Sequence, residues 1–175
     1  MRRRRLQLAA VVAVMGLLGV VAAAVAGGGS RDIREHLKGY EEVPAVSTLA
    51  SGEFSAKVRD SAIEYRLSYS GLEGDVQQAH IHLGQERVNG MISVFLCSNL
   101  NNGPTGTQAC PPAPATVSGT IGPSDVIGPA AQGIAPGEYA ELLRAIRAGV
   151  TYANVHSTKF PGGEIRAQLE RNHGH

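Results

Sequence analysis

Apolar and polar side chains alternate with a period of two along most of the later part of the chain. In the clearest case, Ile63, Tyr65, Leu67 and Tyr69 alternate with polar residues. Successive side chains of a strand point to opposite faces, so this alternation predicts a half-buried antiparallel strand over residues 62–69. Comparable short patterns predict further strands over residues 52–58, 76–83, 91–97, 115–121, 151–157 and 163–169.

One segment, residues 137–148, carries apolar residues at helical spacing instead. Pro136 precedes this segment and Gly149 follows it, which is the asymmetry typical of helix ends. We expect the apolar side of this helix to cover one open end of the strands. Many short strands with one short helix predict an all-β fold, an antiparallel sandwich or barrel.

The N-terminal segment differs from the rest of the chain. Four arginines, Arg2 to Arg5, are followed by an uncharged stretch over residues 6–26 that ends in small residues. This layout is typical of a secretory signal peptide, and the apolar run is also long enough to anchor the chain in a membrane. Both alternatives predict an exported protein, secreted or held on the extracellular face of the membrane. The predicted organisation is a signal or anchor (1–26), a linker (27–36), one domain (37–170) and a flexible tail (171–175).

Composition narrows the possible partners. The 175 residues include 22 glycines and 9 prolines, which favours many turns over long helices. The formal net charge is only +1, which argues against nucleic acid as a partner. So small a net charge also argues against an anionic surface as the main partner.

Two cysteines, Cys97 and Cys110, are present. In an exported chain an even number of cysteines predicts a disulfide. A bridge between them would close a loop of mainly small and polar residues, and the chain-entropy model gives it about 3 kcal/mol of stabilisation.

Histidines and other polar residues gather on three of the predicted strands. His80 and His82 are separated by one residue, so they share one face of their strand. His156 lies on a later strand with Asn154, and the last strand carries polar residues as well. Because apolar neighbours take the core-facing positions, we expect all these polar side chains on the outer face, as one polar surface patch. The patch comprises His80, His82, Asn154, His156, Glu164 and Arg166.

Three imidazoles from two strands suit a transition metal such as copper or zinc. Glu164 is a candidate for a fourth ligand or for an outer residue that orients the ligands. It shares a face with Arg166, so the two side chains are also candidates for a structural ion pair. The alternative is that the histidines are hydrogen-bonded surface residues without a metal. No motif of a nucleophile elbow or of a phosphate-binding loop is present, so no catalytic residue is predicted.

Several motifs resemble the CHRD family, whose domain was first described in chordin and also occurs in many bacterial secreted proteins. The resemblance runs from about residue 37 to residue 169, nearly the whole exported part, and identifies the chain as a single-domain secreted member. It is carried by Leu-Lys-Gly-Tyr-Glu-Glu-Val-Pro at 37–44, Ala-His-Ile-His-Leu-Gly at 79–84, Gly-Val-Thr-Tyr-Ala-Asn-Val-His-Ser at 149–157 and Pro-Gly-Gly-Glu-Ile-Arg-Ala-Gln-Leu at 161–169.

The resemblance implies an immunoglobulin-like β-barrel with limited similarity to copper/zinc superoxide dismutases, including a His-x-His that points away from the barrel. The family has no settled activity, and a second metal site with a bridging histidine and an aspartate is not recognisable in this sequence. We therefore expect a binding module with an outer-face histidine site for copper or zinc, and not an enzyme. The alternatives are a copper-dependent oxidoreductase resembling superoxide dismutase, and a structural or adhesive extracellular domain without metal.

Overall fold

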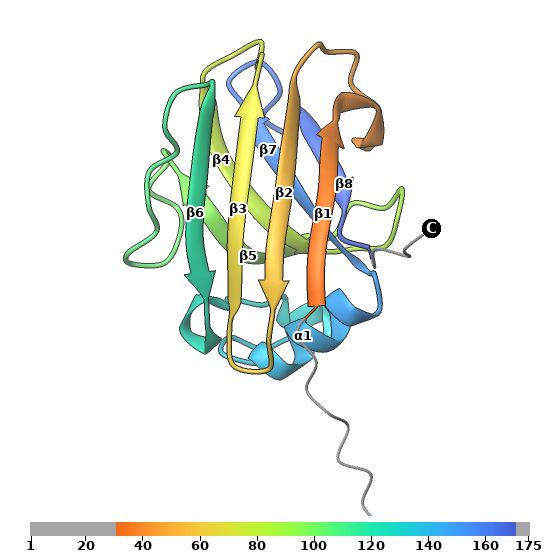
Figure 1. Ribbon diagram of the computed structural model, residues 1–175, viewed down its shortest axis with the longest axis vertical. Helices are drawn as coiled ribbons and strands as arrows, with labels where there is room; N and C mark the ends of the chain where they lie inside the picture. Colours follow the sequence, from red (N-terminus) through yellow and green to blue (C-terminus); the bar gives the residue numbers. More distant parts are fainter. Residues whose placement is uncertain (1–30, 171–175) are drawn as a thin grey trace, which may run out of the picture.

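The computed structural model describes residues 31–170, which form one antiparallel sheet of eight strands (Figure 1). The strands are β1 (Arg31–Lys38), β2 (Ser51–Val58), β3 (Ile63–Ser70), β4 (Val76–Leu83), β5 (Met91–Ser98), β6 (Ala115–Ile121), β7 (Thr151–Ser157) and β8 (Ile165–Gln168). Their order is β5-β4-β7-β8-β1-β2-β3-β6, and the sheet curls into a near-closed barrel. The fold class predicted from the alternation is confirmed.

The barrel has two layers with the core between them. Strands β1, β2, β3 and β6 form the front layer in Figure 1, and β4, β5, β7 and β8 form the back layer. Phe54 and Leu67 from the front layer and Ile81, Val155 and Ile165 from the back layer are fully buried. Burying side chains of this size stabilises a fold by roughly 1.5–3 kcal/mol each, so the alternating apolar positions supply the main driving force for folding.

The helix α1 (Tyr139–Arg147) covers one end of this barrel, the lower end in Figure 1. Leu142, Leu143 and Ile146 on its apolar side are buried in the same core as the strands. This confirms the predicted helix and its predicted place. Three short 3-10 helices lie in the connections: η1 (Gly39–Glu41), η2 (Pro123–Asp125) and η3 (Ala130–Gln132).

The predicted linker over residues 27–36 is wrong from Arg31 onward, because this segment is the strand β1. It pairs with β2 along its whole length and meets β8 at Lys38. Ile33 and Leu37 are buried, while the residues between them are exposed or half-buried. The predicted signal or anchor (1–26) and the tail (171–175) lie outside the described residues. Within residues 31–170, no helix combines the length and the apolar character needed to cross a membrane.

The predicted disulfide between Cys97 and Cys110 is present, with 13 residues of sequence separation. We expect replacement of both cysteines by alanine to lower the free energy of unfolding by about 3 kcal/mol, because the bridge restricts the unfolded chain. Urea denaturation of the variant and of the wild-type protein measures this difference. Reduction of the wild-type protein with a thiol serves as the control and should give a similar loss; an unchanged midpoint in both would contradict the prediction.

Candidate metal centre

The pairing of β4, β7 and β8 brings the predicted site residues together. His80 lies opposite Asn154 in the antiparallel register of β4 and β7, and His156 lies opposite Gln78. Asn154 in turn lies opposite Arg166 on β8. The apolar neighbours of these residues along each strand belong to the core. The polar residues therefore occupy the face away from the core, as the alternation predicted.

The expected surface patch is nevertheless wrong, because these side chains are buried. His80, His82 and His156 are 0%, 7% and 6% exposed, and Asn154, Glu164 and Arg166 are buried with them. Connecting segments fold back over this face: backbone carbonyls of Gly90 and Pro161 contact His82 and His156. Alternation along a strand predicts on which face of the sheet a side chain lies. It does not predict whether loops cover that face.

Backbone carbonyls fix the orientation of two imidazoles. Nδ1 of His156 lies 2.9 Å from the carbonyl oxygen of Pro161, and Nδ1 of His82 lies 3.1 Å from that of Gly90. A carbonyl oxygen only accepts hydrogen bonds, so each Nδ1 carries the proton and each Nε2 of the neutral rings keeps its lone pair. This is the way in which metal-binding histidines are commonly held.

The three rings converge on one point. Each offers a nitrogen that lies within 4.8 Å of the other two. Nδ1 of His80 and Nε2 of His156 are 3.1 Å apart, close to the separation of about 3.3 Å for two nitrogens bound at about 2.0–2.1 Å to a tetrahedral ion. The outer limit of 4.8 Å exceeds this tetrahedral separation by about 1.5 Å, so ring nitrogens that far apart must approach each other by about that distance to share one ion.

Two ring nitrogens of the cluster have no hydrogen-bond partner. Nε2 of His80 and Nε2 of His82 are both buried and unpaired. A buried polar atom without a partner costs roughly 1–3 kcal/mol, so such atoms are uncommon in a folded chain unless a ligand, an ion or water uses them. Of these two atoms, Nε2 of His82 can bind an ion together with Nδ1 of His80 and Nε2 of His156, because one imidazole offers a single ion only one of its nitrogens. These three nitrogens fit a transition metal that prefers imidazole.

Burial keeps all three imidazoles neutral. Loss of solvent lowers the pKa of His80 to about 2, with further contributions from His156 and His82. It lowers the pKa of His82 to about 4, partly offset by the hydrogen bond with Gly90. The pKa of His156 is lowered for the same reason. Neutral imidazole is the form that binds metal ions.

These pKa values predict that the metal-free protein loses stability in mild acid. The unfolded chain takes up protons on its histidines below pH 6.5, whereas the folded chain does not until the pH approaches about 4 for His82 and about 2 for His80. The contribution of the histidines to stability is therefore fully present above pH 6.5 and is lost as the pH falls. Glu42 acts in the opposite direction, because its pKa is raised from 4.5 to about 7 on folding and its ionisation destabilises the fold as the pH rises.

With three histidines against one carboxyl group, we expect a net loss on the order of 2 kcal/mol between pH 7 and pH 5. Urea denaturation of chelator-treated protein at both pH values measures it. The variant Glu42→Gln lacks the opposing contribution and should show a steeper loss. A wild-type protein that is more stable at pH 5 than at pH 7 would contradict this account.

Arg166 connects the cluster to the loop of residues 84–90. Its guanidinium donates hydrogen bonds to Asn89 Oδ1 and to the carbonyl oxygens of Gln85 and Val88. It also lies 3.4 Å above the ring of Tyr152, and this ring is stacked on His82 with centroids 4.7 Å apart. Arg166 thus holds in place the loop that carries the Gly90 carbonyl.

Glu164, a candidate fourth ligand or orienting residue from the sequence, makes its hydrogen bonds with residues outside the histidine cluster. Its Oε1 accepts hydrogen bonds from the Thr48 hydroxyl and from the backbone N–H of Glu73. The described residues contain no ion pair between Glu164 and Arg166, and Glu164 lies outside the three-histidine group. Its contacts tie the end of the β7–β8 connection to two neighbouring loops.

Sequence reasoning missed Glu42, which is buried beside the site at 6% exposure. Burial raises the pKa of Glu42 to about 7, and Arg166 and a hydrogen bond from Asn154 partly lower it. Glu42 follows the 3-10 helix η1, outside any strand, so alternation carries no signal for it. The signal available was its place in the motif at residues 37–44.

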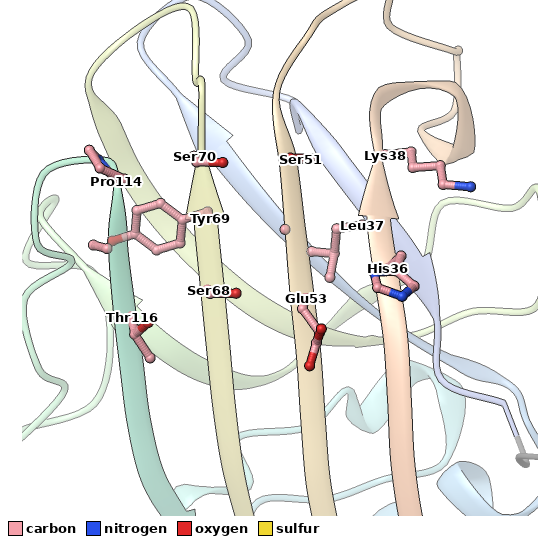
Figure 2. A pocket seen from close by; sticks show the side chains of 12 residues that line it. His36, Leu37, Lys38, Ser51, Glu53, Ser68, Tyr69, Ser70, Pro114 and Thr116 are labelled. Atoms are coloured by element: carbon pink, nitrogen blue, oxygen red, sulfur yellow. The ribbon is translucent and has the colours of Figure 1, made fainter.

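A hollow of about 700 Å³ lies apart from the cluster, on the outer face of the front layer. Figure 2 shows the side chains that line it, spread over β1, β2, β3 and β6. His36, Glu53 and Ser68 lie side by side on three neighbouring strands. No group of three metal-ligating side chains occurs there in residues 31–170. The three-histidine cluster is therefore the better candidate site.

The chain was compared with known proteins and families. The family model described as the CHRD domain matches residues 33–169. No curated protein and no solved structure matches the chain. The matched range includes the eight strands except for the start of β1, and all residues of the cluster. The chain therefore belongs to the CHRD domain family.

Proposed function

We propose that this chain is an exported binding module that holds one copper or zinc ion through His80, His82 and His156. The observation that carries the proposal is the convergence of three buried, neutral imidazoles, two of them oriented by backbone carbonyls. Export is supported by the N-terminal sequence and by the disulfide, which needs an oxidising compartment.

Burial favours ion binding over redox turnover at this site. All three rings are at most 7% exposed, and the loop held by Arg166 supplies the carbonyl that contacts His82. An ion among these rings is shielded from solutes, whereas turnover requires a substrate to reach the metal. Imidazole suits both copper and zinc, and the general order of affinities places Cu²⁺ above Zn²⁺.

The test is the retention of metal by the purified protein. After loading with Cu²⁺ or Zn²⁺ and desalting, elemental analysis should find one ion per chain. His80→Gln, His82→Gln and His156→Gln should each weaken binding by more than about 100-fold, because loss even of outer residues that orient a ligand costs about 10–100-fold.

The matched control is His36→Gln, which alters an exposed histidine on β1 and should bind one ion like the wild-type protein. Circular dichroism establishes that each variant is folded. The proposal fails if the wild-type protein retains no ion, or if the folded cluster variants retain as much metal as His36→Gln.

A further inference from the structure

The side chain of Asn154 lies at the centre of the histidine cluster. It is 2% exposed, and its Oδ1 is 3.1 Å from Nε2 of His156. Asn154 is also paired with His80 across β4 and β7. One amide thus reaches the same space as the three rings.

The neighbours of this amide determine which end faces the histidines. Asn154 lowers the pKa of the buried Glu42 carboxyl, as a nearby hydrogen-bond donor does. The Nδ2 end of the amide is its donor end, so this effect places Nδ2 on the side of Glu42. Oδ1 therefore points toward the rings, as its distance from His156 shows.

This arrangement places two acceptors in contact inside the protein. Nδ1 of His156 donates to the Pro161 carbonyl, so Nε2 of the neutral ring keeps its lone pair and cannot donate to Oδ1 of Asn154. Nδ1 of His80 lies 3.1 Å from Nε2 of His156, so a proton on Nδ1 can form a hydrogen bond with that nitrogen. Oδ1 of Asn154 still has no donor. Facing lone pairs are unfavourable in a buried site, and a cation between them removes the conflict.

We propose that Asn154 Oδ1 is the fourth ligand of the metal ion, and that Glu42 holds the amide in the orientation that this requires. The proposal rests on the proposed function, since it completes that site. Three imidazole nitrogens and one amide oxygen form a set for a divalent ion such as Zn²⁺ or Cu²⁺. These four ligands are uncharged, so the Glu42 carboxylate next to them supplies the nearest negative charge from outside the ligand set.

Three variants test the role of the amide oxygen. Asn154→Ala removes the oxygen and should weaken Zn²⁺ binding by more than about 10-fold. Asn154→Asp keeps an oxygen at the same place and should bind Zn²⁺ better than Asn154→Ala. Glu42→Gln should weaken binding by about 10-fold, as expected for an outer residue that orients a ligand. Glu41→Gln, a change at the exposed neighbour of Glu42, is the control and should leave affinity unchanged.

Affinities come from competition with a chromophoric chelator, and a second readout is the visible spectrum of the Co²⁺-loaded protein. That spectrum reports the ligands directly, so it should change in Asn154→Ala and Asn154→Asp and stay constant in Glu41→Gln. If Asn154→Ala keeps the wild-type affinity and spectrum while His156→Gln loses the metal, the fourth ligand is not Asn154, and the proposed function stands.

Two further outcomes would also overturn the inference. If folded Asn154→Ala and Asn154→Asp lose affinity equally, the NH₂ end of the amide faces the rings and donates to His156. If the wild-type protein binds no ion, the proposed function and the fourth ligand fail together. Should Asn154→Ala not fold, the comparison of Asn154→Asp and Glu42→Gln with Glu41→Gln decides the question.

Discussion

Replacement of Arg166 by alanine is expected to lower the free energy of unfolding by about 3–5 kcal/mol, because hydrogen bonds to a charged group contribute roughly 1.5–3 kcal/mol each. Arg166 is only 1% exposed. In the alanine variant, Asn89 and two backbone carbonyls of the loop of residues 84–90 lose the hydrogen bonds that Arg166 donates to them. The substitution also removes the positive charge that favours the ionised form of the Glu42 carboxyl.

Urea denaturation of Arg166→Ala measures this effect. Arg66→Ala is the matched control, because Arg66 is exposed on β3 and surface changes of this kind are usually within about 0.5 kcal/mol of zero. The same variant should bind metal more weakly, since the loop that Arg166 holds includes the Gly90 carbonyl that orients His82. Equal effects of the two substitutions would show that Arg166 does not hold this loop.

Metal binding is expected to stabilise the fold by about 4 kcal/mol when the free metal concentration is about 1,000 times the dissociation constant. The three rings come from β4 and β7, and their register brings them together only in the folded chain. An ion that binds the folded chain and not the unfolded chain therefore shifts the unfolding equilibrium.

Denaturation with and without buffered Zn²⁺ measures this stabilisation. His156→Gln should show almost none of it, whereas His36→Gln should show all of it. Equal stabilisation of the wild-type protein and His156→Gln would place the metal elsewhere on the chain.

Most of the fold could be predicted from the period-two alternation. The predicted ranges 76–83, 115–121 and 151–157 coincide with β4, β6 and β7. The strand β1 was missed because its pattern is weak: Ile33 and Leu37 are its two buried apolar residues, and Glu35 occupies the inward position between them. The strand conformation of β1 is stabilised by its hydrogen-bonded pairing with β2, which follows in sequence after η1. The local sequence of β1 does not reveal this pairing.

The convergence of the three histidines could also be predicted, but their burial could not. Alternation placed His80, His82 and His156 together on the face away from the core, as the structure does. Their burial depends on loops that return over the strands, and the sequence of a loop does not reveal its path. Glu42 was missed for the same reason, because it reaches the site from the segment after η1 and not from a strand.

The most direct test of the account is anomalous X-ray diffraction from crystals of the zinc- or copper-loaded protein, recorded at the absorption edge of the metal. The account predicts one strong anomalous peak about 2.0–2.1 Å from a ring nitrogen of each of His80, His82 and His156. A peak only at another place, such as beside the exposed His36, or no peak within bonding distance of these three rings, would contradict it.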